Sequence, residues 1–153
     1  MNIQVVADEI QGFDEHQFVG PIQERLVAQA EKELEVTFPP EYRQFLLTLG
    51  SGSVSSESFI GMGGAKHLDI VWMTRALRQK KTERPFPTDL LPVRTDGFGN
   101  YDCVDMSHPT ASGEYAIVEW LHDAGGQKGK VLAMGYFEWF LAILQMIRDL
   151  EVR

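Results

Sequence analysis

The first strong hydrophobic pattern lies between residues 21 and 34. Apolar residues recur there at intervals of four, which favours one face of an amphipathic α-helix. These residues are Ile22, Leu26, Ala30 and Leu34. Gly20 and Pro21 are typical of a helix start, and the charged residues between the apolar ones belong on a solvated face. We therefore predict a helix over residues 21–34.

A second helical pattern follows a break at Pro39 and Pro40. Its apolar residues fall at i, i+3, i+4 and i+7, and they are Tyr42, Phe45, Leu46 and Leu49. Gly50 can adopt the left-handed conformation of a helix C-cap, so the helix is expected to end there. The serine-rich stretch 51–58 is then expected to be a flexible loop.

Two further helices are predicted nearer the C-terminus. One runs from Asp69, an N-cap residue, to about residue 80, and a basic, proline-broken connection follows over residues 80–87. The other covers residues 137–150, where the apolar residues form a face suited to covering a sheet. This face consists of Phe137, Phe140, Leu141, Leu144 and Ile147.

Between these helices the apolar period changes to two, which indicates strands. Segments 91–95 and 101–106 are expected to pair as a hairpin around the glycine-containing turn 96–100. Strands over 115–121 and 131–134 follow, separated by a turn at 122–130, and residues 59–60 form a further short strand. Helices, then consecutive strands, then a helix predict an α+β fold: a central antiparallel β-sheet with helices packed on one face, in a single domain over residues 1–153.

Composition restricts the cellular setting. The chain is 44% hydrophobic and 24% charged, which is typical of a globular domain, and its only cysteine is Cys103. An intramolecular disulfide is therefore impossible, and a reducing compartment fits. The sequence predicts neither a signal peptide nor a membrane-spanning segment, so we expect a cytoplasmic protein.

The charge balance restricts the partners. With 22 acidic and 14 basic residues, the formal net charge is −8 and the isoelectric point about 4.9. Such a charge opposes direct binding of nucleic acid or of an anionic membrane surface. The acidic surface either serves solubility or matches a basic partner protein.

Cofactor motifs fail at defined positions. The glycines of 61–66 lack the last glycine of a dinucleotide-binding loop, and 125–130 lacks the first glycine and the Ser or Thr of a P-loop. Around Asp96 the calcium-loop spacing fails because Phe98 and Tyr101 occupy the expected ligand and glycine positions. The histidines never occur at zinc-site spacing. We expect no cofactor and no metal, and we interpret 96–105 as a polar hairpin with outward-facing acids.

The remaining residues give little indication of a catalytic site. Cys103 lies in a predicted strand beside Asp102, whose charge disfavours a thiolate, so we expect a small buried side chain. A hydrolase that uses Glu119, His122 and Asp123 stays open as an alternative of a different class. Trp72 and Trp139 lie beside the apolar stripes of their helices, and partly exposed tryptophan is favoured at protein interfaces.

Several stretches of the chain resemble the SUKH (Smi/Knr-like) superfamily. The opening motif covers 22–50 and includes Phe38-Pro39-Pro40 and Phe45-Leu46. The similarity continues through 96–105, 118–123 and 137–141, so it extends over most of the chain. Within the superfamily the sequence is most similar to the YobK-type bacterial immunity proteins. It departs from the usual pattern at Leu49-Gly50, where an Asn-Gly pair is common.

This resemblance implies a function based on binding. Superfamily members are mostly bacterial immunity proteins that bind and neutralise the C-terminal domain of a secreted toxin, often a nuclease, without an active site. We therefore expect a cognate toxin, a basic nuclease, as the partner. A regulatory scaffold of the Smi/Knr type is the alternative. The residues expected to bind the partner are Asp96, Asn100, Asp102, Asp105, Glu119, Asp123 and Trp72.

Overall fold

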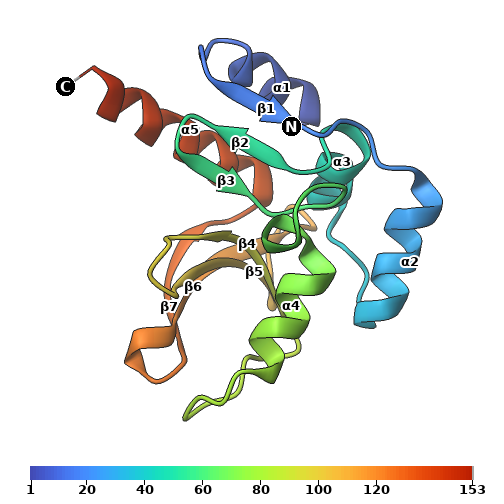
Figure 1. Ribbon diagram of the computed structural model, residues 1–153, viewed down its shortest axis with the longest axis vertical. Helices are drawn as coiled ribbons and strands as arrows, with labels where there is room; N and C mark the ends of the chain where they lie inside the picture. The colour runs from blue at the N-terminus through green and yellow to red at the C-terminus, as the bar shows by residue number, and fades with distance from the viewer. Residues whose placement is uncertain (153) are drawn as a thin grey trace.

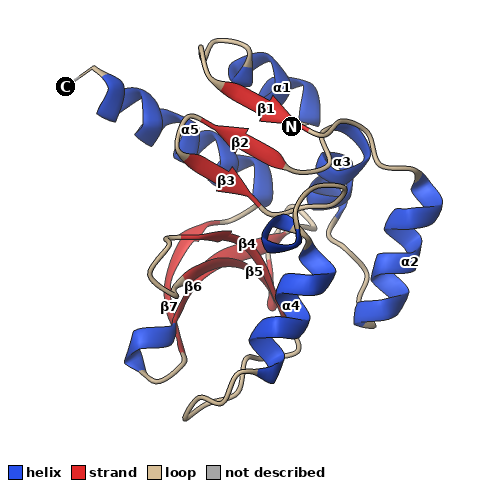
Figure 2. Cartoon of the chain, viewed as in Figure 1, coloured by secondary structure: helices blue, strands red, loops and turns tan. Residues whose placement is uncertain are grey.

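The computed structural model describes residues 1–152, and over that range helices pack against two separate sheets (Figures 1 and 2). The α-helices are α1 (Ile3–Ile10), α2 (Glu24–Leu34), α3 (Pro40–Thr48), α4 (Ile70–Gln79) and α5 (Tyr136–Glu151). Two short 3-10 helices are η1 (Lys66–Leu68) and η2 (His122–Ala124).

The strands of both sheets pair antiparallel. One sheet has the order β1-β2-β3, from β1 (His16–Phe18), β2 (Gly52–Val54) and β3 (Glu57–Phe59). The other has the order β4-β5-β6-β7, from β4 (Leu90–Thr95), β5 (Tyr101–Pro109), β6 (Tyr115–Leu121) and β7 (Gln127–Ala133). A hydrogen bond from Ile60 N to the Val93 carbonyl (3.0 Å) connects the two. The predicted α+β class with antiparallel strands is confirmed, although the strands form two sheets.

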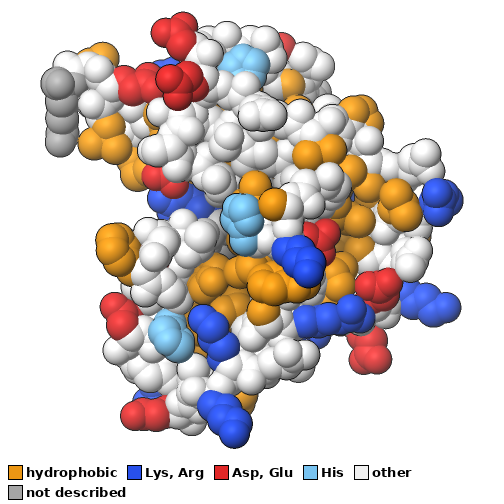
Figure 3. Space-filling model, viewed as in Figure 1, with side chains coloured by type: hydrophobic (Ala, Val, Ile, Leu, Met, Phe, Trp, Pro, Cys, Tyr) orange, Lys and Arg blue, Asp and Glu red, His pale blue; other side chains and the backbone are white. Residues whose placement is uncertain are grey.

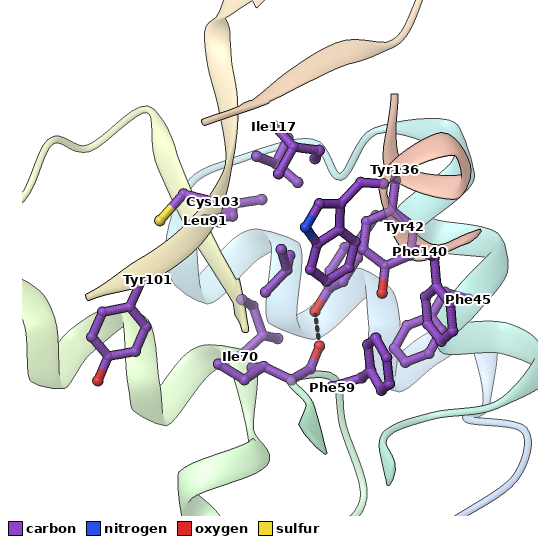
Figure 4. Close-up of a cluster of buried hydrophobic side chains, with 14 of the residues drawn as sticks. Tyr42, Phe45, Phe59, Ile70, Leu91, Tyr101, Cys103, Ile117, Tyr136 and Phe140 are labelled. Atoms are coloured by element: carbon purple, nitrogen blue, oxygen red, sulfur yellow. Dashed lines mark hydrogen bonds between the residues drawn. The ribbon is translucent and has the colours of Figure 1, made fainter. Parts of the chain in front are cut away.

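Aromatic side chains of α5 occupy the centre of the core. Phe140 stacks on Phe59 of β3 with ring centroids 4.0 Å apart, and its ring lies 5.8 Å from that of Phe45 in α3. Tyr42 of α3 donates a hydrogen bond to the Ile60 carbonyl (3.0 Å), so its buried hydroxyl is satisfied. Figure 4 shows these side chains from α3, β3 and α5 gathered together. The last helix therefore joins the N-terminal sheet to the rest of the molecule.

The predicted helices are present, and one apolar face needs correction. In α2 the buried residues are Val27, Ala30 and Leu34, whereas Leu26 is 37% exposed. In a helix of 3.6 residues per turn, residues four apart are rotated by about 40° from one to the next. A series with this spacing therefore cannot stay on one face of the helix. The helix also begins only at Glu24, after Ile22.

The N-terminal elements were not apparent from the sequence. Segment 51–58, predicted to be a flexible loop, forms β2 and the first two residues of β3, and α1 and β1 precede them. Of the short strand predicted over 59–60, only Phe59 lies in β3. Strands of three residues contain too few alternating positions to show a period of two. Their pairing is fixed by distant residues, because β2 also pairs with β1, where His16 lies opposite Val54. In the other sheet, β7 begins at Gln127, within the predicted turn.

The glycine stretch after β3 serves close packing of the main chain. A Cβ atom at Gly61 would lie 1.7 Å from the Gly50 carbonyl oxygen, so no other residue fits there. Gly50 has φ +76°, which confirms its predicted left-handed conformation at the end of α3. Met62 N then donates to the Gly50 carbonyl (2.9 Å). These contacts give the glycine stretch a structural role.

Candidate interaction surfaces

Asp102 of β5 is directed into the molecule, so the expectation of an outward-facing acid is wrong at this position. Its side chain is 14% exposed and accepts hydrogen bonds from Arg94 (3.1 Å) and from Trp139 Nε1 (3.0 Å). Arg94 also pairs with Glu57 of β3 at 2.9 Å. Burial raises the pKa of Asp102, against the opposing effects of Trp139 and Arg94. This network links both sheets to α5, and it also accounts for the burial of Trp139.

Asp105 is likewise buried, at 4% exposure, and was also wrongly expected to face outward. One carboxylate oxygen accepts from Lys128 Nζ (3.1 Å) and the other from Ser107 N (3.0 Å) and Oγ (2.6 Å). Burial alone would raise the pKa of Asp105, but the hydrogen bonds from Ser107 and Lys128 outweigh it and the pKa lies below its ordinary value. Its carboxylate is therefore already occupied within the chain.

The turn between β4 and β5 is ordered by its own side chains. Asp96 Oδ1 accepts from the N–H groups of Phe98 (2.7 Å) and Asn100 (3.1 Å). Asn100 Oδ1 accepts from His122 N (2.9 Å), which fixes the turn against η2. Asp96 and Asp123 are exposed. We call this group, Asp96, Phe98, Asn100, His122 and Asp123, the hairpin tip.

Phe98 is 86% exposed at the hairpin tip and was not singled out as a binding residue by the sequence analysis. An aromatic residue between two glycines in a turn has no core to enter, and this signal could have identified it. An exposed aromatic side chain beside carboxylates provides the apolar centre and the charged rim of a protein interface.

The residues of the hydrolase alternative do not form a catalytic arrangement. Glu119 Oε1 accepts a hydrogen bond from Lys130 N (3.2 Å), while His122 donates its main-chain N–H to Asn100 Oδ1. Within residues 1–152, no hydrogen bond joins the His122 ring to the carboxylate of Glu119 or Asp123. A histidine without an orienting partner has no fixed tautomer for acid–base work.

Cys103 is fully buried in β5, as predicted. Burial raises the pKa of its thiol well above the ordinary value, with smaller contributions from Asp102 and Asp105. A neutral, enclosed thiol is a poor nucleophile. Over the described part of the chain, no three His, Cys, Asp or Glu side chains are grouped so that they could hold a metal ion.

A further buried carboxylate, that of Glu114, lies near the start of α5. Glu114 is 8% exposed, and its Oε1 has no hydrogen-bond partner among residues 1–152. The neighbouring Glu41 accepts from Phe137 N (3.0 Å). Burial, together with the charge of Glu41, raises the pKa of Glu114 to about 7.

Trp72 lies on α4, separate from the hairpin tip. It is 46% exposed, as expected of an interface tryptophan, whereas Trp120 and Trp139 are 4% and 2% exposed. In Figure 1, α4 lies to the right of the four-stranded sheet, and the short helix η2, drawn in orange, lies at the lower left of that sheet. The expected partner-binding residues therefore do not form a single surface. Asp96, Asn100 and Asp123 lie at the tip, Glu119 lies near it on β6, and Trp72 lies on another face.

Comparison with solved structures identifies other α+β proteins of this architecture. One is described as "Crystal structure of protein from Pseudomonas syringae pv. tomato" and matches with a TM-score of 0.58 at 18% identity. The match covers 81% of this chain and 86% of that chain. At this identity the likeness concerns the fold alone.

The family follows from the sequence. The SUKH_6 family model, described as SMI1-KNR4 cell-wall, matches residues 24–140. The chain therefore belongs to this family. A search of curated proteins finds no match. Membership supports an immunity protein or a Smi/Knr-type protein. Within residues 1–152, no helix is long and apolar enough to cross a membrane.

Proposed function

We propose that this chain is an immunity protein that binds and neutralises a cognate secreted toxin in the cytoplasm of the cell that makes it. The family to which the chain belongs supports this function. Neutralisation occurs by binding the C-terminal toxin domain, a basic nuclease, and needs no catalysis by the immunity protein. Within the superfamily, we place the chain with the YobK-type immunity proteins.

The hairpin tip is the observation that carries the proposal. It presents Phe98 at 86% exposure beside the exposed acids Asp96 and Asp123, on a turn held by hydrogen bonds. A turn that is already ordered loses little conformational entropy on binding. Glu119, partly exposed on β6, adds to the acidic rim.

Charge complementarity supports a nuclease as the partner. A nuclease needs basic residues to hold the phosphates of its substrate, and an acidic protein can occupy the same surface. With a net charge of −8, this chain would be steered towards such a surface, and binding there would exclude the nucleic acid.

Asp102 and Asp105 have a supporting role in this proposal. Their carboxylates accept hydrogen bonds from Arg94, Trp139, Lys128 and Ser107. In this proposal they therefore stabilise the hairpin and do not bind the toxin. Reversal of either charge would damage the fold, and a binding test must leave both unchanged.

Survival of cells that express the toxin tests the proposal. The toxin domain encoded next to this gene is induced together with the parent chain or with the double variant Phe98→Ala/Asp123→Lys. We expect the parent to protect and the double variant to protect less. Leu150→Ala, at a residue 57% exposed on α5, and Asp14→Lys, at an exposed loop position, are matched controls that should protect fully.

Each result is decisive. Full protection by the double variant would exclude the hairpin tip as the binding site. Failure of the parent to protect would refute the immunity function and favour the Smi/Knr-type regulatory alternative, for which the description of the family model is the specific support. That alternative predicts a cellular signalling or wall-assembly partner in place of a toxin.

A further inference from the structure

Helix α4 has an outward face with an apolar character. Its inner face consists of Ile70, Met73, Thr74 and Leu77, which are buried. The outward residues follow the spacing i, i+1, i+4, i+5 and i+8 of one helix face. They are Val71, Trp72, Arg75, Ala76 and Gln79, and together with Asp69 they line an open hollow of about 410 Å³.

A second hollow extends this surface towards α2. It has a volume of about 230 Å³, and Asp69 and Val71 line both hollows. Its apolar lining includes Leu26, which is 37% exposed, and Met62. Figure 3 shows hydrophobic side chains gathered over α4 in the middle of this face, with Lys and Arg side chains around them. We call the two hollows together the α4 groove.

The segment that forms this face is basic in an otherwise acidic chain. Residues 66–84 contain six of the 14 basic residues and only two of the 22 acids. The bases are Lys66, Arg75, Arg78, Lys80, Lys81 and Arg84, and the acids are Asp69 and Glu83. The segment is thus net positive, while the rest of the chain has a large excess of acids.

Few of these bases are neutralised within the molecule. Arg75 lies 3.7 Å from Glu33, a long and exposed contact, and Arg78 donates to the Thr88 carbonyl (3.1 Å). Within residues 1–152, Lys66, Lys80 and Lys81 make no ion pair. Two acids line the groove: Asp69 accepts from Trp72 N (2.9 Å) as the cap of α4, and Glu33 of α2 is the partner of Arg75.

We infer that the α4 groove binds an acidic segment of a partner protein. An apolar side chain of that segment packs against Trp72 and Val71, and its carboxylates meet Arg75 and the neighbouring lysines. Apolar contact at the centre and complementary charge at the rim are the features of a specific protein interface. This partner has the opposite charge to a nuclease, so the inference does not depend on toxin binding at the hairpin tip.

Nucleic acid fits this surface less well. The excess of acids outside 66–84 repels a polyanion that extends beyond the groove, whereas a short acidic segment avoids this repulsion. The hollow is also lined by aliphatic carbon from Val71 and Ala76 beside Trp72, which suits a protein side chain.

Peptide binding tests the inference. The probe is a short fluorescein-labelled peptide that is rich in glutamate and has one central phenylalanine, titrated with the full chain by fluorescence anisotropy. We expect saturable binding that weakens as salt rises, and a Kd about tenfold weaker for Trp72→Ala and for Lys66→Glu/Arg75→Glu. Lys32→Glu and Lys130→Glu, which alter exposed lysines elsewhere, should have little effect.

Peptide and site controls make the result specific. A peptide with lysine in place of glutamate should not bind, and one with alanine in place of phenylalanine should bind about tenfold more weakly. Amide chemical shifts should change in 66–80 and stay constant in 96–100. Equal binding to the Trp72→Ala and charge-reversed variants, shifts confined to other residues, or displacement of the peptide by single-stranded DNA would overturn the inference.

Discussion

At the scale of single residues, buried ionisable side chains join parts of the chain that are far apart in sequence. Asp102 of β5 contacts Arg94 of β4 and Trp139 of α5, and Arg94 reaches Glu57 of β3. Such a network is specified by the fold as a whole, because each charge is stable in a buried position only when its partners are present. No local sequence pattern indicates such a network, which explains why outward-facing acids were predicted at Asp102 and Asp105.

Asp102→Ala should destabilise the fold by about 3 kcal/mol, because it leaves Arg94 partly buried without one partner and the Trp139 indole N–H without its acceptor. The free energy of unfolding in urea measures this effect. Asp123→Ala, at an exposed acid, is the control and should change stability by less than about 0.5 kcal/mol. Equal stability of the two variants would mean that the network does not hold the sheets together.

Glu114 gives the stability a specific pH dependence. Its pKa is about 7 in the folded chain against an ordinary value of 4.5, so between these values the unfolded state releases a proton that the folded state retains. The contribution of Glu114 to stability is therefore fully present below pH 4.5 and is lost as pH rises through 7. The loss amounts to about 3 kcal/mol.

Glu114→Gln should remove this dependence, because the amide stays neutral at every pH. Urea unfolding of the parent and the variant at pH 5 and pH 8 should show a variant that is more stable relative to the parent at the higher pH. Glu151→Gln, at an exposed position on α5, should follow the parent. The account of Glu114 fails if the difference between Glu114→Gln and the parent is the same at both pH values.

At the scale of elements, a helix or strand was predicted more accurately when its periodic apolar pattern was longer. Helix α3, strand β6 and helix α5 lie close to their predicted bounds because each has enough periodic positions to fix its face. The predicted N-cap Asp69 is also confirmed, and Gly50 has the predicted left-handed conformation just after α3, since helix ends depend on local chemistry. The three-residue strands β1, β2 and β3 depend on pairing across the chain, which a local pattern does not contain.

Phe45→Ala tests the packing of α3 against α5. Phe45 is fully buried and its ring lies within 6 Å of the rings of Tyr42, Tyr136 and Phe140. Its truncation should cost about 3 to 5 kcal/mol and lower the thermal midpoint or cause aggregation. The same substitution at Phe98, which is 86% exposed, should leave the midpoint unchanged. An unchanged midpoint for Phe45→Ala would contradict the core described above.

At the scale of the whole molecule, opposite charges are divided between two surfaces. The hairpin tip combines Phe98 with exposed acids, whereas the α4 groove has Trp72 and Arg75 in its lining and adjoins the basic segment 66–84. The sequence indicated Trp72 and the exposed acids Asp96 and Asp123 individually, because residue type alone suggests exposure or an interface. It could not show that they lie on different faces, since this depends on the packing of α4 beside the sheet.

The measurement closest to the central claim is the rate at which the purified chain associates with the toxin domain that the proposed function requires, sought in the gene next to its own. The parent should bind tightly, and its association rate should fall as salt rises. Phe98→Ala/Asp123→Lys should associate more slowly and with less sensitivity to salt, while Asp14→Lys should retain the rate and affinity of the parent. Association of the tip variant at the parent's rate and affinity at both low and high salt would contradict toxin binding through the hairpin tip.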